Sequence, residues 1–349
     1  MRTARSTALS LLIALLLCAP AWAQPTPPAG QGAALDRWLG QLNRPFIIGL
    51  AGDSGSGKST FATGLQQTLG ADRVKIMCVD DYHRLDRQGR KTAGVTALNP
   101  LATDLDRLAR DLGTLRRGKT IDKPVYDHSN GTLAPSEKFK PAQIIIVEGL
   151  HPFATKSLRK QVDLSIYFDP SSRVKESWKV KRDVGERGHT LQAVRKSIRE
   201  RKPDYKAYVQ PQRAQADVLV QFDWSAATQE GLAVKVRHQG QRPVAQRIRV
   251  NASGEGFVLR GERRRDGSGV VTLDGRVPLT AVSRLDRLVK RATGVRDPQI
   301  QRRSETLDAT RLLVASRVMK EIVRKGTQER SVGRAFHFTP RRLRAAAGR

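Results

Sequence analysis

Residues 52–60 have the types and spacing of a phosphate-binding loop. Their sequence, GDSGSGKST, fits the pattern G-x-x-x-x-G-K-[ST]. The glycines allow successive backbone N–H groups to turn inward around a phosphate. Lys58 can reach the β- and γ-phosphates of a nucleotide, and the Ser59 hydroxyl can ligate Mg²⁺. The chemistry expected here is therefore phosphoryl transfer from ATP, with Mg²⁺ as its cofactor.

The residues on either side of this loop support that interpretation. The apolar run 46–51 predicts a buried strand before the loop, and 60–69 predicts a helix after it. The N-terminus of such a helix favours negative charge. A chance glycine-rich turn is the alternative, and the strand and helix disfavour it. The residues expected to bind ATP are Gly52, Asp53, Ser54, Gly55, Ser56, Gly57, Lys58, Ser59 and Thr60.

A second set of chemically active residues follows the strand predicted over 72–78. Asp80 and Asp81 come directly after it, and His83 and Arg87 follow. One carboxylate can take the proton of an acceptor hydroxyl, while the cations hold an anionic substrate. A helix cap or a solvated turn is the plainer interpretation of an Asp-Asp pair. The position favours an acceptor site, because ligands of open α/β sheets bind at the carboxyl ends of strands.

Two further segments can complete such a site. Glu148 ends the apolar run 144–148, which predicts a central parallel strand, and its carboxylate can hold Mg²⁺ opposite the loop. The basic segment 171–187 predicts a helix. A solvated charged face is its plainer interpretation. Beside a phosphate loop, the segment is better explained as a lid whose arginines close over ATP and stabilise the transferred phosphoryl group.

The remaining patterns predict an α/β fold with a mostly parallel sheet flanked by helices, followed by a smaller mixed β/α C-terminal region. Up to Asp223, we expect helices over 104–116 and 155–160, a loop over 120–133 and strands over 164–168 and 216–222. Beyond Glu230, we expect antiparallel strands over 233–237, 246–250, 256–260 and 270–273, and helices over 285–291 and 307–323.

The N-terminus has the pattern of a secretory signal peptide, with Arg2 and Arg5 before an apolar run and an A-x-A site ending at Ala23. An over-extended start codon on a cytoplasmic protein is the alternative. Export and ATP chemistry point to different compartments, so the localisation stays open between the two. The expected organisation is a signal peptide over 1–23, a linker over 24–43, a kinase core over 44–222, an extension over 223–324 and a basic tail, disordered by composition, over 325–349.

The net charge of +30 predicts anionic partners such as nucleotides, phosphorylated metabolites, nucleic acid or acidic lipid. Only 5% of the residues are aromatic, which disfavours single-stranded nucleic acid because its bases need stacking platforms. The two cysteines are Cys18 and Cys78. Signal cleavage would leave Cys78 alone, which rules out an intramolecular disulfide in the mature chain.

Seven motifs in residues 46–222 resemble the plant and cyanobacterial type of the phosphoribulokinase/uridine kinase family. They cover about half of the chain, and the region after Phe222 is only loosely similar. Together the motifs are highly specific, although singly only the first two are informative. They read AGDSGSGKST, VDDYHRLDR, KPVYDH, VEGLHP, KRDVGERGHT, RKPDYKAY and PQRAQADV.

This resemblance implies a P-loop kinase fold and Mg-ATP-dependent phosphorylation of the 1-hydroxyl of ribulose 5-phosphate, a step of the Calvin cycle. By position, Asp80 resembles the general base. The residues implied for catalysis are Asp80, Lys58, Arg182, Asp183 and Arg187. Those implied for the sugar phosphate are His83, Arg87, Tyr126, His128 and Lys179, and those for the metal are Ser59 and Glu148.

One departure from the family concerns a pair of cysteines that forms a thiol switch in the plant-type enzymes. The plant-type enzymes carry a cysteine inside the phosphate loop that pairs with one just before the Asp-Asp. Here Cys78 occupies the second place, but Ser56 occupies the first. A disulfide cannot form between these two positions.

Two other functions stay open. A uridine kinase would share the loop and the lid, but His83, His151, His189 and Arg87 favour an acceptor that carries phosphate. A non-catalytic exported nucleotide- or anion-binding protein would explain the signal-like N-terminus. Such a protein would not need the complete set of catalytic residues, Lys58, Ser59, Asp80 and Glu148, that this chain retains. The expected partner is a small-molecule sugar phosphate, without specific nucleic acid and without a membrane span after signal cleavage. Whether the chain assembles into a homo-oligomer is left open by the sequence.

We predict that Lys58→Met leaves the fold intact and abolishes phosphoryl transfer. The substitution removes the cation that contacts the β- and γ-phosphates, so the rate should fall by at least about 100-fold. ADP release and circular dichroism of the purified variant measure the two effects. Wild-type turnover would contradict the assignment of the loop.

Overall fold

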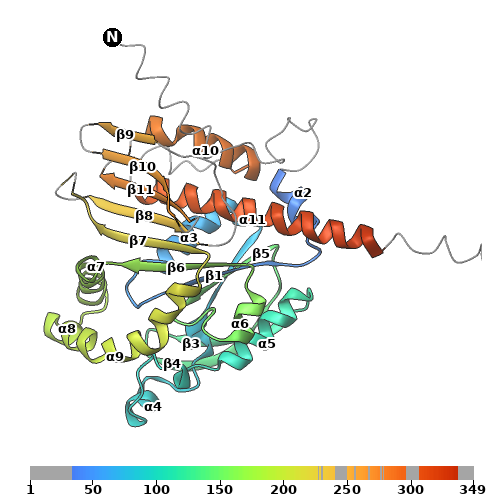
Figure 1. Cartoon of the computed structure of the whole chain (residues 1–349). Coiled ribbons are helices and arrows are strands. Elements are labelled where there is room, and N and C mark those ends of the chain that lie inside the picture. Colours follow the sequence, from blue (N-terminus) through green and yellow to red (C-terminus); the bar gives the residue numbers. More distant parts are fainter. Residues whose placement is uncertain are drawn as a thin grey trace, which may run out of the picture.

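The computed structural model describes residues 34–226, 228, 231–239, 250–254, 257–265, 268–275, 277, 279–295 and 306–336. A nine-stranded sheet runs through this part of the chain, and helices lie on both faces of it around the central strands β1 and β5 (Figure 1). The predicted signal peptide and the first part of the predicted linker lie outside the described residues. No described helix combines the length and apolarity needed to cross a membrane.

The first half of the sheet is parallel and has the order β2-β5-β1-β6-β7. Every residue of β1 and β5 is buried, because helices cover both faces of the sheet there. This burial explains why these strands have continuous apolar sequences. The strands are β1 (Phe46–Gly52), β2 (Val74–Cys78), β5 (Ile144–Gly149), β6 (Leu164–Pro170) and β7 (Val218–Trp224).

The second half of the sheet is antiparallel and continues from β7 in the order β8-β11-β10-β9. The C-terminal strands therefore extend the core sheet and share its hydrophobic interior. The strand predicted over 246–250 falls almost entirely outside the described residues, and β9 begins where that prediction ends. The four strands are β8 (Leu232–His238), β9 (Val250–Gly254), β10 (Phe257–Arg263) and β11 (Gly269–Gly275).

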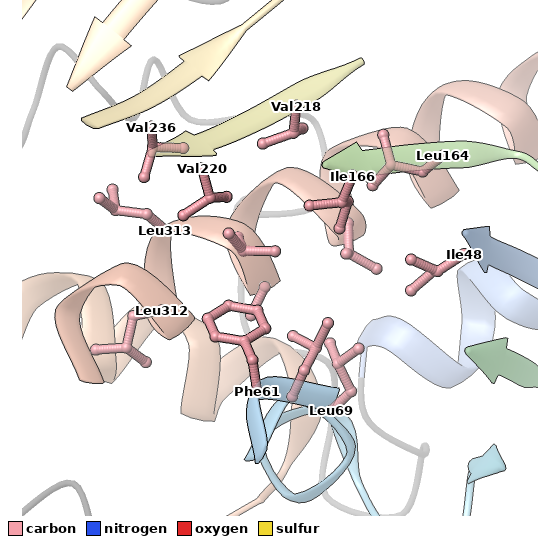
Figure 2. Packing of buried hydrophobic residues seen from close by; sticks show 14 of the residues in the cluster. Ile48, Phe61, Leu69, Leu164, Ile166, Val218, Val220, Val236, Leu312 and Leu313 are labelled. Carbon is pink, nitrogen blue, oxygen red and sulfur yellow. The ribbon is translucent and has the colours of Figure 1, made fainter. Parts of the chain in front are cut away.

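Alternate residues of β1 pack into separate cores on the two faces of the sheet. Ile48 packs on the side of α3 (Lys58–Leu69) and α11 (Thr306–Phe336), and Figure 2 shows it in one hydrophobic cluster with Phe61 and Leu312. Ile47 packs on the opposite side, against the helix α5 (Leu105–Arg116). Two more helices, α2 (Ala34–Gly40) and α10 (Leu279–Thr293), join the first core, and α6 (Lys156–Gln161) joins the second.

The basic segment 171–187 forms a helix, as predicted, and two helices that were not predicted follow it. The first, α7 (Ser172–Gly185), begins at a serine whose hydroxyl accepts a hydrogen bond from the Val174 N–H. The second, α8 (Leu191–Glu200), begins in the same way at Thr190, and α9 (Lys202–Asp204) follows it. The predicted helix therefore ends at Gly185, two residues early, and a turn containing Gly188 separates α7 from α8.

Three segments differ from the prediction. The loop expected over 120–133 is the start of a hairpin made of β3 (Ile121–Asp127) and β4 (Thr132–Phe139), and its register shifts at Pro124, which hid the strand pattern. Residues 34–40 of the expected linker form α2, because Leu35 and Leu39 are buried in the core. Residues 325–336 of the expected tail continue α11, where Gly326 packs against α2.

The carboxylate of Asp163 ties together several separate segments at the start of β6. Arg44 contacts it through both terminal nitrogens, at 2.8 and 3.0 Å, and Arg116 of α5 contacts it at 3.0 Å. The Ile47 N–H also donates to it at 3.0 Å. Lys325 of α11 lies 3.8 Å away, and only 2% of the Asp163 side chain is exposed. A buried carboxylate is stable here because several donors compensate it.

We predict that Asp163→Ala destabilises the fold by about 3–5 kcal/mol, because it leaves two arginines and a backbone N–H without their buried partner. Chemical denaturation measures the free energy of unfolding. As a matched control, Asp122→Asn removes the exposed ion pair with Lys138 and should change stability by less than about 1 kcal/mol. Equal effects of the two substitutions would contradict the role given to Asp163.

Candidate functional site

The phosphate loop connects the end of β1 to the start of α3. Gly55 and Gly57 have φ angles of 80° and 82°, in the left-handed region where a side chain would be strained. The Lys58 ammonium donates to the Asp53 carbonyl at 2.8 Å, so its side chain lies back over the loop. The structure therefore has the backbone shape and the cation that the motif predicts for binding phosphate.

Helix α7 packs directly on this loop. A Cβ atom built on Gly55 would lie 3.0 Å from the Cβ of Lys179, and one built on Gly57 would lie 3.3 Å from the Trp178 ring. Lys175 of the same helix forms an ion pair of 2.7 Å with Asp53. The predicted lid thus lies against the loop, and the glycines are needed for this close approach as well as for their φ angles.

A cavity of about 860 Å³ opens in front of the loop, at the carboxyl ends of β1, β2 and β5. Most of the predicted site residues line it, although they come from distant parts of the sequence. They are Ser54, Gly55, Ser56, Gly57, Lys58, Ser59, Thr60, Asp80, His128, Glu148, Arg182 and Arg187. Gly52 and Asp53 shape the loop without lining this cavity, and Asp53 lines a smaller one beside it.

Oxygen ligands suited to Mg²⁺ lie together at one end of the cavity. The Ser59 hydroxyl donates to Glu148 Oε1 at 2.9 Å. Burial raises the pKa of Glu148, and the positive charge of Lys58 only partly offsets this effect. A carboxylate in such a position gains from a bound cation. A hydroxyl and a carboxylate are the hard oxygen donors that Mg²⁺ prefers, so these residues fit the predicted metal.

The two adjacent aspartates after β2 differ in their surroundings. Asp81 accepts from the Lys123 ammonium at 2.6 Å and from the Tyr126 N–H at 3.1 Å, so it holds the β3–β4 hairpin in place. Asp80 faces the cavity, and the Nε2 atom of His128 lies 3.8 Å from its Oδ2. Asp81 lines the cavity as well, but Lys123 and the Tyr126 N–H engage both of its oxygens, so Asp80 is the carboxylate better placed to accept a proton from an acceptor hydroxyl.

Three predicted substrate residues lie behind His128 and do not line the cavity. The His83 and Tyr126 rings meet edge to face at 4.9 Å, and Tyr126 meets His128 in the same way at 5.0 Å. Burial lowers the pKa of His83, which favours its neutral form. Arg87 donates to the His128 carbonyl at 3.1 Å. In this arrangement His83, Arg87 and Tyr126 position His128, which alone of the four lines the cavity.

The lid cations share one carboxylate, Asp183. It accepts from Lys179 at 2.7 Å, from Arg182 at 2.8 Å and from Arg187 at 3.4 Å. Burial alone would raise the pKa of Asp183, but the hydrogen bonds and positive charges of Arg182 and Lys179 outweigh it and lower the pKa to about 2. Asp183 does not line the large cavity, and Lys179 lines the smaller one, of about 460 Å³. Of the three cations that share Asp183, Arg182 and Arg187 line the large cavity.

Sequence reasoning missed several residues of the cavity. Arg201, at the end of α8, lines both cavities, and burial lowers its pKa. Its signal was present, because it begins the motif RKPDYKAY. Leu307 and Arg311 of α11 also line the large cavity, as does Trp178 of α7. No motif marks these two residues, so only the fold could place them there.

Comparisons with known proteins agree with this geometry. The model of the phosphoribulokinase/uridine kinase family matches residues 47–228. A phosphoribulokinase of Synechocystis sp. is 49% identical over 181 residues, which cover 52% of this chain and 54% of that protein. The chain thus spans about half the length of the curated phosphoribulokinases it matches. A uridine kinase of Ligilactobacillus salivarius is 31% identical over 182 residues, which cover 51% of this chain and 85% of that protein.

Among solved structures, the phosphoribulokinase from Rhodobacter spheroides has a TM-score of 0.51 at 20% identity. The match covers 72% of this chain and 99% of that one, and it supports the fold. The family model covers more than half of the chain, including the phosphate loop, both aspartates, Glu148 and the lid. The chain therefore belongs to the phosphoribulokinase/uridine kinase family.

Proposed function

We propose that this protein is an ATP-dependent kinase that phosphorylates the 1-hydroxyl of ribulose 5-phosphate and yields ribulose 1,5-bisphosphate. The observation that carries the proposal is the placement of Asp80 in the same cavity as the phosphate loop, with Arg182 and Arg187 at its edge. The 49% identity to a protein named phosphoribulokinase supports the choice of acceptor.

The residues proposed for the site divide the work of this reaction among them. The backbone N–H groups of the loop and Lys58 hold the β- and γ-phosphates of ATP. Mg²⁺ at Ser59 and Glu148 would neutralise charge on these phosphates. The Asp80 carboxylate accepts the proton of the acceptor hydroxyl as its oxygen attacks the γ-phosphorus. Arg182 and Arg187 stabilise the negative charge of the group in transfer, and Asp183 orients them.

The phosphate of the acceptor needs its own cation. His128 is a candidate because it lines the cavity 3.8 Å from Asp80, and Arg201 is another because it lines the same cavity from the lid. His83, Arg87 and Tyr126 act through the position of His128. Uridine kinase activity is the second candidate, supported by the 31% identical relative from Ligilactobacillus salivarius. A neutral nucleoside would not need this set of cations.

The test is ADP release by the purified chain with Mg-ATP and either ribulose 5-phosphate or uridine. We expect turnover with ribulose 5-phosphate and none with uridine. The Lys58→Met variant controls for contaminating kinases. Turnover with uridine alone would replace the proposed acceptor. Absence of ADP release with both acceptors would contradict the proposed activity.

We predict that Asp80→Asn lowers kcat by roughly 100- to 10,000-fold and changes the KM for ATP by less than about threefold. The substitution removes the base and leaves the nucleotide contacts in place. Steady-state kinetics with both substrates separate the two effects. An unchanged kcat would exclude Asp80 as the base, and a large rise in the KM for ATP alone would assign it to nucleotide binding.

We predict that Glu148→Gln raises the Mg²⁺ concentration needed for half-maximal rate by roughly 10- to 100-fold, because it removes the buried carboxylate from the metal ligands. Rates measured over a Mg²⁺ series at fixed ATP give this value. The matched control is Glu200→Gln on α8, which removes an exposed ion pair with Lys196. If both variants require the same Mg²⁺ concentration as the wild type, Glu148 does not hold the metal.

A further inference from the structure

Three side chains with metal-binding atoms meet beside the proposed base. Cys78 ends β2, Asp80 lies in the short helical turn Val79–Tyr82 after it, and His128 follows β3. The Cys78 Sγ, one carboxylate oxygen of Asp80 and one ring nitrogen of His128 all lie within 4.8 Å of one another. The proposed kinase reaction uses Asp80 and His128 but gives no role to Cys78.

The chemistry of this cluster differs from that of the Mg²⁺ ligands. A thiolate, an imidazole and a carboxylate are the ligands of Zn²⁺ and related cations, whereas Mg²⁺ prefers oxygen atoms. Tetrahedral zinc places neighbouring ligand atoms about 3.3–3.8 Å apart. The 3.8 Å between Asp80 Oδ2 and His128 Nε2 already meets this spacing, and the half-exposed His128 can move to complete it.

The position of the cluster also suits a cation. All three residues line the large cavity, so an ion held by them would keep a fourth position open to the cavity. Asp81 is compensated by Lys123, whereas the neighbouring Asp80 and Glu148 leave negative charge around the thiol. The phosphate loop contains no cysteine with which this thiol could form a disulfide. Cys78 is therefore free to act as a ligand.

We propose that Cys78, Asp80 and His128 form a binding site for a thiophilic divalent cation, represented by Zn²⁺, and that its occupancy inhibits phosphoryl transfer. Binding replaces the thiol proton, which leaves to solvent, with a sulfur–metal bond. The Asp80 carboxylate then coordinates the ion and is no longer available to accept a proton from the acceptor hydroxyl. The inhibition, unlike the binding, rests on the proposed function of Asp80.

Direct binding is tested on the full chain without nucleotide, by competition for Zn²⁺ with a chromophoric chelator. We expect one ion per chain in the presence of millimolar Mg²⁺. In Cys78→Ser, the affinity for Zn²⁺ should fall by at least about 10-fold. Loss of a residue that only hydrogen-bonds to a metal ligand already lowers metal affinity by about this factor, and loss of the ligand itself should lower it no less. His128→Ala tests the same site if the first variant does not fold. His189→Ala, in the turn after α7, is the matched control and should bind as the wild type does.

Substitution of Co²⁺ for Zn²⁺ identifies the ligand atoms through the absorption spectrum. A sulfur-to-cobalt charge-transfer band in the near ultraviolet should appear with the wild type and with His189→Ala, and it should be absent from Cys78→Ser. Absence of the band from the wild type, or undiminished Zn²⁺ affinity in Cys78→Ser and His128→Ala, would overturn the site. These measurements need no turnover, so they decide the site even if the proposed kinase activity fails.

Inhibition is measured as ADP release over a Zn²⁺ series, relative to each variant's own rate without Zn²⁺. We expect the Zn²⁺ concentration for half inhibition to rise by at least about 10-fold in Cys78→Ser, in step with the loss of binding. Equal inhibition of the wild type and Cys78→Ser would overturn the link between this site and activity. Full activity of the wild type with Zn²⁺ bound would do the same.

Discussion

The parallel pairing of β1 with β5 on one side and β6 on the other is the constraint on which the site depends. It aligns Ala51 with Gly149 and Gly52 with Phe168, so the phosphate loop and Glu148 leave the sheet at the same edge. β2 joins the other side of β5, and Cys78 is paired there with Glu148. Residues nearly 100 positions apart thus surround one cavity without any long connecting loop.

A second constraint is the concentration of positive charge around that cavity. Cations placed together repel one another, and the structure limits this repulsion by sharing carboxylates among them. Asp183 holds three lid cations, and Asp53 holds Lys175 against the phosphate loop. The lid can therefore pack on the loop before any phosphate is bound. A bound polyphosphate would find Arg182 already oriented, which reduces the ordering that binding requires.

The sequence predicted the elements whose patterns depend on local geometry. The glycines of the phosphate loop and the continuous apolar runs of β1 and β5 each have a local physical cause. The β3–β4 hairpin was missed because Pro124 interrupts the alternation of apolar and polar residues in β3. The fold of this hairpin places His128 at the cavity and Tyr126 against the His128 ring. Arg311 could not be predicted, since an amphipathic pattern does not say which cavity a helix will border.

The packing of α11 has a consequence for how the chain could be divided. The family model ends at residue 228, yet α3, which carries Lys58, is covered by α11 from the far end of the sequence. Leu312 and Leu313 are buried in the same core as Phe61 and Ile48. The half that the family model matches therefore shares its hydrophobic core with the end of the chain. A truncation after residue 228 would uncover the apolar face of α3, the helix that follows the phosphate loop, and the remaining N-terminal half would be expected to aggregate.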